Sequence, residues 1–145
     1  MRKYCLVLFG FVFGLVFMSC NQKQTVNYDS MPEELAKIYQ EIEKNPKDAN
    51  LYVKLSNYYT HTKQLDSALN NALVAIRLDP DNSTVYVAAF DVYFSMENLD
   101  AAEEMLKKAI ALDKKNNEAY LKLGLLYFTT NDFQSSKEIL IQAIR

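Results

Sequence analysis

The stretch ANLYVKLSNYYTHTKQLDSALNNALVAIRLDPDN, from Ala49 to Asn82, recurs in outline twice further along the chain and decides the fold. Its aromatic, aliphatic and small residues have counterparts one fixed interval further along the chain, and again after a second interval of the same length. The three sets are Tyr52, Leu55, Tyr59, Ala68 and Ala75; Tyr86, Ala89, Tyr93, Ala102 and Ala109; and Tyr120, Leu123, Tyr127, Ser136 and Ala143. Spacings of three, four and seven within a set put such positions on one face of a helix. The gap between the Tyr59 and Ala68 positions predicts a turn, so each unit is expected to be a helix, a short turn and a second helix.

The recurring pattern resembles the tetratricopeptide repeat (TPR), a unit of about 34 residues. In this repeat an aromatic residue, Leu, a small residue, Tyr, Ala, an apolar residue, Ala and Pro follow one another. In the first unit these places are filled by Tyr52, Leu55, Ser56, Tyr59, Ala68, Ala72, Ala75 and Pro80. The resemblance implies an all-α fold, an α-solenoid of antiparallel helix pairs (the TPR superhelix), with repeats at 49–82, 83–116 and, incomplete, 117–145.

The second repeat departs most from the pattern, with Phe90 at the small position and Lys114 at the proline. A phenylalanine needs more room than the alanine, serine or glycine that this place usually holds. We expect Phe90 either to push the two helices of its repeat apart or to fill a neighbouring gap.

An additional helix is expected over residues 30–46, upstream of the first repeat. Ser30 is the expected cap, Pro32 falls in the first turn and Glu33 completes a capping box. Pro46 precedes Pro80 by one repeat period, so this segment matches the second helix of a preceding unit. It would cover the open end of the first repeat.

Residues 1–19 have the layout of a secretory signal. Basic residues, an apolar run and a small residue follow one another as Arg2, Lys3, residues 4–18 and Ser19. A membrane-spanning helix needs about 20 apolar residues and this run is shorter, so cleavage is favoured over the alternative of an uncleaved anchor. Residues 17–20, Phe-Met-Ser-Cys, resemble the lipobox of bacterial lipoproteins. That resemblance implies removal of the signal peptide 1–19, acylation of Cys20 and a lipidated polar tether over residues 20–29.

A lipid on Cys20 would anchor the chain to a membrane and place it in the bacterial cell envelope. Stable anchoring takes more than one acyl chain, and lipoproteins of this type carry two or three. Asn21 follows the cysteine where an aspartate would mark inner-membrane retention in some bacteria, and it therefore favours the outer membrane.

The composition points away from catalysis and from nucleic acid. The 16 basic and 18 acidic residues are scattered, so no nucleic-acid partner is expected. His61 is the single histidine, and Cys20 would be the single cysteine after cleavage, which excludes the usual metal clusters and nucleophilic pairs. We expect no enzyme activity, no metal and no cofactor.

In TPR arrays the first helices of successive repeats line a groove, and the resemblance carries a peptide-binding role onto Asn57, Val87, Asp91, Phe94, Leu121, Lys122, Leu125 and Phe128. The carboxylate clamp of some TPR domains is disfavoured, because only Asn57 and Lys122 match it, whereas Val53, Ala88 and Glu118 replace Lys, Asn and Lys. An apolar groove suits an amphipathic helix or an extended apolar peptide. The alternative is that a further helix of a longer chain packs there.

These features predict a lipid-anchored protein–protein interaction module, acting as an adaptor or assembly factor in the bacterial envelope. The alternative is a targeting or regulatory module of a larger enzyme whose C-terminal part is missing.

The last helix is expected from about residue 134 and carries more apolar side chains than one preceding helix can bury, namely Ile139, Leu140, Ile141 and Ile144. Either the chain is a piece of a longer array or this face meets a second molecule. We expect the helix to self-associate or to fray.

Overall fold

The computed structural model describes residues 28–143 of the chain. The expected signal peptide 1–19, the lipidation site Cys20 and most of the tether lie outside the described residues, as does Ile144. Within the described range, no helix combines the length and the apolar character that crossing a membrane requires.

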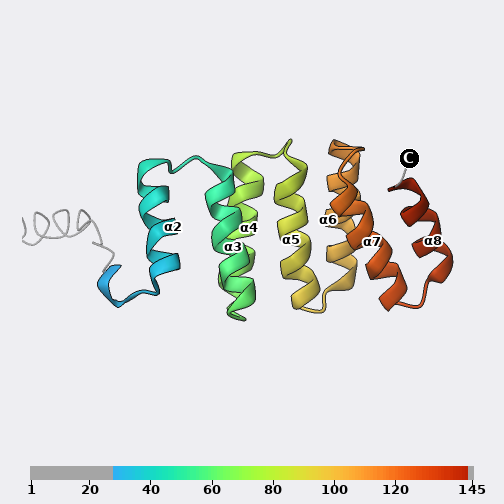
Figure 1. Cartoon of the computed structure of the whole chain (residues 1–145), viewed down its shortest axis with the longest axis horizontal. Coiled ribbons are helices and arrows are strands. Elements are labelled where there is room, and N and C mark those ends of the chain that lie inside the picture. The colour runs from blue at the N-terminus through green and yellow to red at the C-terminus, as the bar shows by residue number, and fades with distance from the viewer. Residues whose placement is uncertain (1–27, 144–145) are drawn as a thin grey trace, which may run out of the picture. The chain divides into compact units, whose positions relative to one another are not determined.

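The described residues are all-α. The elements are the 3-10 helix η1 (Tyr28–Ser30) and the α-helices α2 (Glu33–Lys44), α3 (Ala49–His61), α4 (Leu65–Leu78), α5 (Ser83–Ser95), α6 (Leu99–Leu112), α7 (Asn117–Thr129) and α8 (Phe133–Gln142) (Figure 1). The element η1 belongs to a separate unit, residues 1–31, whereas α2 to α8 form one compact unit.

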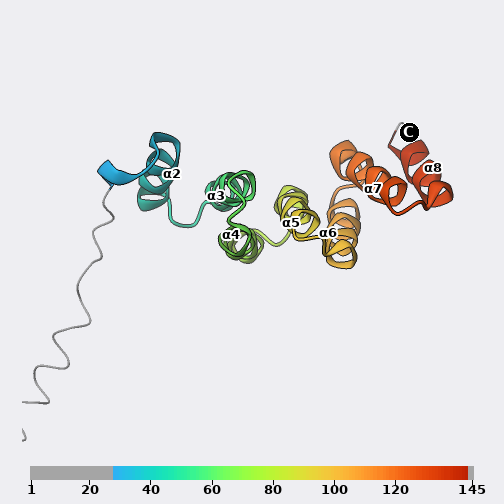
Figure 2. The same ribbon diagram turned by 90° about the horizontal axis from the view of Figure 1, so that it is seen from below.

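Six of the helices pack as antiparallel pairs, α3 with α4, α5 with α6 and α7 with α8. Neighbouring pairs are joined because α4 packs on α5 and α6 packs on α7, and the first helices α3 and α5 also touch. Figure 2 shows the same helices closer to end-on. The helix α2 packs against α3 on the side away from the second pair. This arrangement confirms the all-α array of helix pairs expected from the repeat period.

Side-chain caps begin the first helix of each repeat. The side-chain oxygens of Asp48, Asn82 and Asn116 accept hydrogen bonds of 2.9, 3.0 and 3.0 Å from the backbone N–H groups of Asn50, Thr84 and Ala119. Such caps satisfy donors that have no partner inside the helix. The three capping residues are spaced by the repeat period, so the cap belongs to the repeat itself.

The turn inside each repeat has a residue in the left-handed region. Lys63, Glu97 and Asn131 have φ angles of 60°, 59° and 62°. The next residue then donates its backbone N–H to the carbonyl of the repeat tyrosine, at 2.9 Å from Gln64 to Tyr59, from Asn98 to Tyr93 and from Asp132 to Tyr127. This geometry closes the end of the first helix and turns the chain into the second.

The start of α2 differs from the expected capping box. The helix begins at Glu33 with Pro32 as its N-cap, and no side chain caps it, so Ser30 lies too far upstream for that role. Ser30 instead ends η1, a short helix that the sequence pattern did not predict. The helix α2 is accordingly shorter than the expected span of 30–46.

The small residues of the pattern are buried in the apolar clusters between the helices. Ala68, Ala75, Ala102 and Ala109 are fully buried, and larger side chains there would hold the helices apart. Two repeat tyrosines also fix the preceding loops, because the Tyr52 hydroxyl donates to the Pro46 carbonyl at 3.0 Å and the Tyr86 hydroxyl to the Pro80 carbonyl at 2.9 Å.

Phe90 fills a neighbouring gap, the second of the two outcomes expected for it. Its side chain is buried in the main apolar cluster. Its ring stacks on Phe94 with a centroid distance of 5.5 Å, and the ammonium of Lys122 lies 5.5 Å from the Phe90 ring centroid. The aromatic side chain thus contributes contacts toward α7.

Candidate peptide-binding surface

A cavity of about 400 Å³ opens on the face formed by the first helices of the three repeats. It is lined by side chains from α3, α5 and α7 and from the turn after α3, namely Asn57, Thr60, His61, Lys63, Asp91, Phe94, Ser95 and Lys122. We call it the central cavity. The lining is mostly polar, with Phe94 as its aromatic member.

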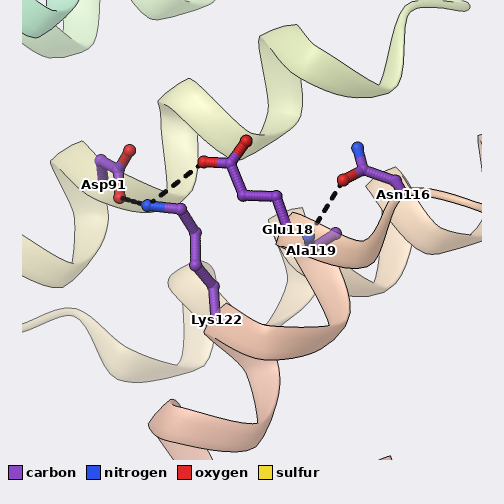
Figure 3. Close-up of polar contacts among 5 residues, drawn as sticks. All are labelled: Asp91, Asn116, Glu118, Ala119 and Lys122. Carbon is purple, nitrogen blue, oxygen red and sulfur yellow. Dashed lines mark hydrogen bonds and ion pairs between the residues drawn. The ribbon is translucent and has the colours of Figure 1, made fainter. Parts of the chain in front are cut away.

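An ion pair ties α5 to α7 at the edge of the central cavity. The ammonium Nζ of Lys122 lies 2.6 Å from Asp91 Oδ1 and 3.7 Å from Glu118 Oε1, as Figure 3 shows. The same helix α7 is capped by Asn116, which also donates from its side-chain amide to the Ser83 hydroxyl at 3.0 Å. Because two carboxylates already compensate Lys122, this lysine is not a preformed site for a ligand carboxylate.

The structure brings together half of the side chains assigned to the groove. Asn57, Asp91, Phe94 and Lys122 line the central cavity. Val87 does not line it, because its side chain is only 4% exposed and packs in the apolar core. A buried valine has no surface to offer a ligand.

The other three assigned residues are exposed side chains of α7 that lie outside the central cavity lining. Leu121, Leu125 and Phe128 are 56%, 57% and 58% exposed. The Phe128 ring meets Phe133 edge-on, with a centroid distance of 5.5 Å. With Ser136, Lys137, Leu140 and Ile141 these two rings line a shallow, apolar cavity of about 480 Å³ on α7 and α8.

A further cavity of about 480 Å³ lies between α2 and α3. We call it the α2–α3 cavity, and its lining is Glu34, Lys37, Ile38, Lys54, Asn57, Tyr58, His61 and Thr62. It shares Asn57 and His61 with the central cavity. Sequence reasoning missed His61 as a site residue, although its spacing of four from Asn57 places both on one helix face.

A polar cluster on α6 and α7 lies outside the central cavity and the α2–α3 cavity. The Glu103 carboxylate accepts hydrogen bonds of 2.6 Å from the Lys107 ammonium and 2.6 Å from the Tyr127 hydroxyl. These bonds, that of Lys107 first, lower the pKa of Glu103, while burial and then the bond to Glu103 raise the pKa of Tyr127. Within residues 28–143 no group of three or more His, Cys, Asp or Glu side chains is arranged to hold a metal ion.

The antiparallel helix pairs, together with the cavity that the first helix of each pair helps to line, define a helical-repeat scaffold. Comparisons with known proteins agree with this class of fold. A TPR repeat model matches residues 91–131, and a tetratricopeptide repeat model matches residues 118–145. No curated protein sequence matches the chain.

Several solved structures share the fold. The crystal structure of MamA is 23% identical over 74% of this chain and 63% of that chain, with a TM-score of 0.62. YrrB, described as a TPR protein with an unusual peptide-binding site, is 26% identical over 74% of this chain and 55% of that one, with a TM-score of 0.64. The first TPR of Spaghetti (RPAP3), bound to the HSP90 peptide SRMEEVD, is 21% identical over 67% of this chain and 77% of that one, with a TM-score of 0.62.

Residues 91–145 are thus matched by TPR repeat models, and the described residues share their fold with solved TPR structures. The chain spans less than two thirds of the length of the MamA and YrrB chains. Both matching family models describe repeats, and no catalytic family is among them.

Proposed function

We propose that the chain binds a peptide segment of a partner protein in the central cavity and acts as an adaptor or assembly factor. The observation that carries the proposal is that α3, α5 and α7, the first helices of all three repeats, contribute side chains to one cavity. Two similar structures are described as a TPR protein with a peptide-binding site and as a TPR with a bound peptide, which supports the proposal.

The experiment is affinity capture from bacterial envelope extracts with the full chain and two matched variants. Phe94 lines the cavity and is 37% exposed, whereas Leu73, on α4, is 39% exposed and lies outside it. Capture of a partner that is lost with Phe94→Glu and kept with Leu73→Glu supports the proposal. Equal capture by both variants, with unchanged circular dichroism, contradicts it.

We propose that the chain acts in the bacterial cell envelope. A lipid on Cys20 would anchor it to a membrane, and the outer membrane is the one we expect. The support is the order of residues in the first twenty positions, a basic start, an apolar run and Ser19 before Cys20. Metabolic labelling with a radioactive fatty acid tests it. Cys20→Ser should abolish labelling and leave the precursor at its full length, and unchanged labelling of that variant would refute the assignment.

Self-association through the C-terminal helices is part of the proposal. Phe128, Phe133, Leu140 and Ile141 are exposed side by side on α7 and α8, and contiguous apolar surface of this kind favours association. Sedimentation equilibrium of the full chain should show a concentration-dependent mass that Phe133→Ser reduces. A monomer at all concentrations, with slow hydrogen exchange in α8, would contradict both self-association and fraying.

A further inference from the structure

We propose that the joint between the second and third repeats is a hinge, in which Phe90 and Lys122 keep α5 and α7 apart and an ion pair fixes their distance. The inference concerns the array itself and holds whether or not the central cavity binds a peptide. The first helices α3 and α5 pack closely along each other, whereas no comparably close packing joins α5 to α7 within the described residues. The second repeat therefore meets its two neighbours in two different ways.

The residues at equivalent places in the two joints explain this difference. Ser56 on α3 and Ala88 on α5 correspond, one repeat later, to Phe90 on α5 and Lys122 on α7. Ser56 and Ala88 are small, and both are buried. Small side chains allow two helices to approach closely, whereas an aromatic ring and a long aliphatic chain increase the distance between them. We call Phe90 and Lys122 the spacer pair.

The spacer pair fills the space between α5 and α7 with side chains. The Lys122 ammonium lies 5.5 Å from the centroid of the Phe90 ring, which is within the range of a cation–π interaction. Phe90 is only 5% exposed, so its ring is covered although α5 and α7 do not pack closely. Contact across this joint is therefore made by long side chains rather than by closely packed helices.

Polar bonds fix the distance on the side of the joint that α5 and α7 form. Lys122 Nζ lies 2.6 Å from Asp91 Oδ1, and the Asn116 amide donates to the Ser83 hydroxyl at 3.0 Å (Figure 3). The Lys122 and Asp91 side chains are 26% and 37% exposed, so water and salt reach their ion pair. Salt weakens such a partly exposed pair, and the restraint that it provides depends on ionic strength.

The other side of the joint is apolar and forms the axis of the hinge. The helix α6 packs on α7 much as α4 packs on α5. Leu106 and Ile110 of α6 and Tyr120 and Leu123 of α7 belong to one buried apolar cluster, which salt does not weaken. Rotation about this contact changes the distance between α5 and α7, and with it the position of Lys122 in the wall of the central cavity.

The test measures distances between pairs of nitroxide labels in the full chain by double electron–electron resonance. Thr62, Met96 and Thr130 are exposed C-cap residues at the same place in α3, α5 and α7. A ketone-bearing amino acid, to which the nitroxide is coupled, is introduced at 62 and 96 or at 96 and 130, and this chemistry leaves the cysteines unlabelled. In 1 M salt the Debye length falls to about 3 Å, so the 96–130 distribution should widen while the 62–96 distribution stays the same.

Two sets of variants separate the ion pair from the spacer pair. Asp91→Asn should widen the 96–130 distribution at low salt, whereas Glu104→Gln, at an exposed carboxylate of α6, should not. The double variant Phe90→Ser with Lys122→Ala places the small residues of the first joint in the second. It should shorten the mean 96–130 distance by about 2 Å, the range that side-chain size produces between packed helices, and leave the 62–96 distance unchanged.

A 96–130 distribution that stays equally narrow in 1 M salt and in Asp91→Asn would overturn the hinge. A double variant that keeps its helical circular dichroism and its 96–130 distance would overturn the role of the spacer pair. If the double variant loses helicity, Lys122→Ala alone takes its place, because that variant keeps Phe90 in the core. It should alter the 96–130 distance without altering the 62–96 distance, and two unchanged distances would equally overturn the role of the spacer pair.

Discussion

The first helices of the second and third repeats, α5 and α7, occupy the same places in the repeat but differ in burial. Val87 on α5 is 4% exposed, whereas Leu121, its counterpart one repeat later on α7, is 56% exposed. Likewise, Phe94 is more buried than its counterpart Phe128. The helix α5 has α3 and α4 on one side and α6 on the other, whereas α7 packs mainly on α6 and α8. The neighbours of a helix, rather than its own pattern, decide which of its apolar residues are accessible.

The largest expected effect follows from this difference. Val87→Asp places a charge without a partner in the core and should lower the free energy of unfolding by about 3 to 5 kcal/mol. Leu121→Asp, at the equivalent place on α7, should change it by no more than about 0.5 kcal/mol because the side chain is already in water. Urea denaturation followed by circular dichroism measures both values. Similar losses in the two variants would show that α7 is covered in solution.

The contrast also separates what the sequence could predict from what it could not. The repeat period and the positions of Tyr, Ala and Pro predicted helix pairs and small residues at close crossings, because these features depend on residues of one repeat. The family pattern assigns Phe94, Val87 and Leu125 to one groove. In the structure Phe94 lines the central cavity, Val87 is buried and Leu125 is exposed outside that cavity. That division depends on packing between repeats, which a repeat pattern does not contain.

Short-range geometry escaped prediction for a different reason. Ser30 has the residue type of a helix cap, but the backbone turns into η1 there, and α2 begins only at Glu33. In the sequence His61 is only an isolated histidine, and the approach of α2 on one side and of α5 and α7 on the other places it at the border of two cavities.

The raised pKa values of the repeat tyrosines Tyr59 and Tyr127 can be tested by titration. Burial first, and then the 2.8 Å hydrogen bond to Tyr39, raises the pKa of Tyr59 from 10.0 to about 12. The folded pKa lies above the unfolded one, so this stabilisation is complete below pH 10 and is lost as the pH rises toward 12. Absorbance titration of phenolate should find that Tyr59 and Tyr127 both ionise later than an ordinary tyrosine. Tyr39→Phe should lower the pKa of Tyr59 only in part, because burial is the larger cause, and a return to 10 would contradict that order of causes.

Two buried serines in the first and third repeats should respond to alanine with opposite signs. The Ser56 hydroxyl has no hydrogen-bond partner, whereas the Ser136 hydroxyl donates to the Gly124 carbonyl at 2.8 Å. Ser56→Ala removes an unpaired polar atom and should raise the free energy of unfolding by about 1 kcal/mol. Ser136→Ala loses a bond and should lower it by about 1 kcal/mol. Thermal and urea unfolding measure both changes in the free energy of unfolding. Two changes of the same sign would contradict the prediction.

The smallest expected effect compares the turns of the second and third repeats, where Glu97 and Asn131 have φ angles of 59° and 62°. The left-handed region costs most L-residues about 1 to 2 kcal/mol, and glycine avoids this cost. Glycine also gives the unfolded chain more conformational entropy, which opposes folding by about 0.4 to 1 kcal/mol. The two opposite effects together predict that Glu97→Gly stabilises the fold by only about 0.5 kcal/mol. Asparagine tolerates the left-handed region better than glutamate, so Asn131→Gly should be close to neutral. Urea midpoints of the two variants measure the difference, and destabilisation by Glu97→Gly would show that the Glu97 side chain makes a compensating contact.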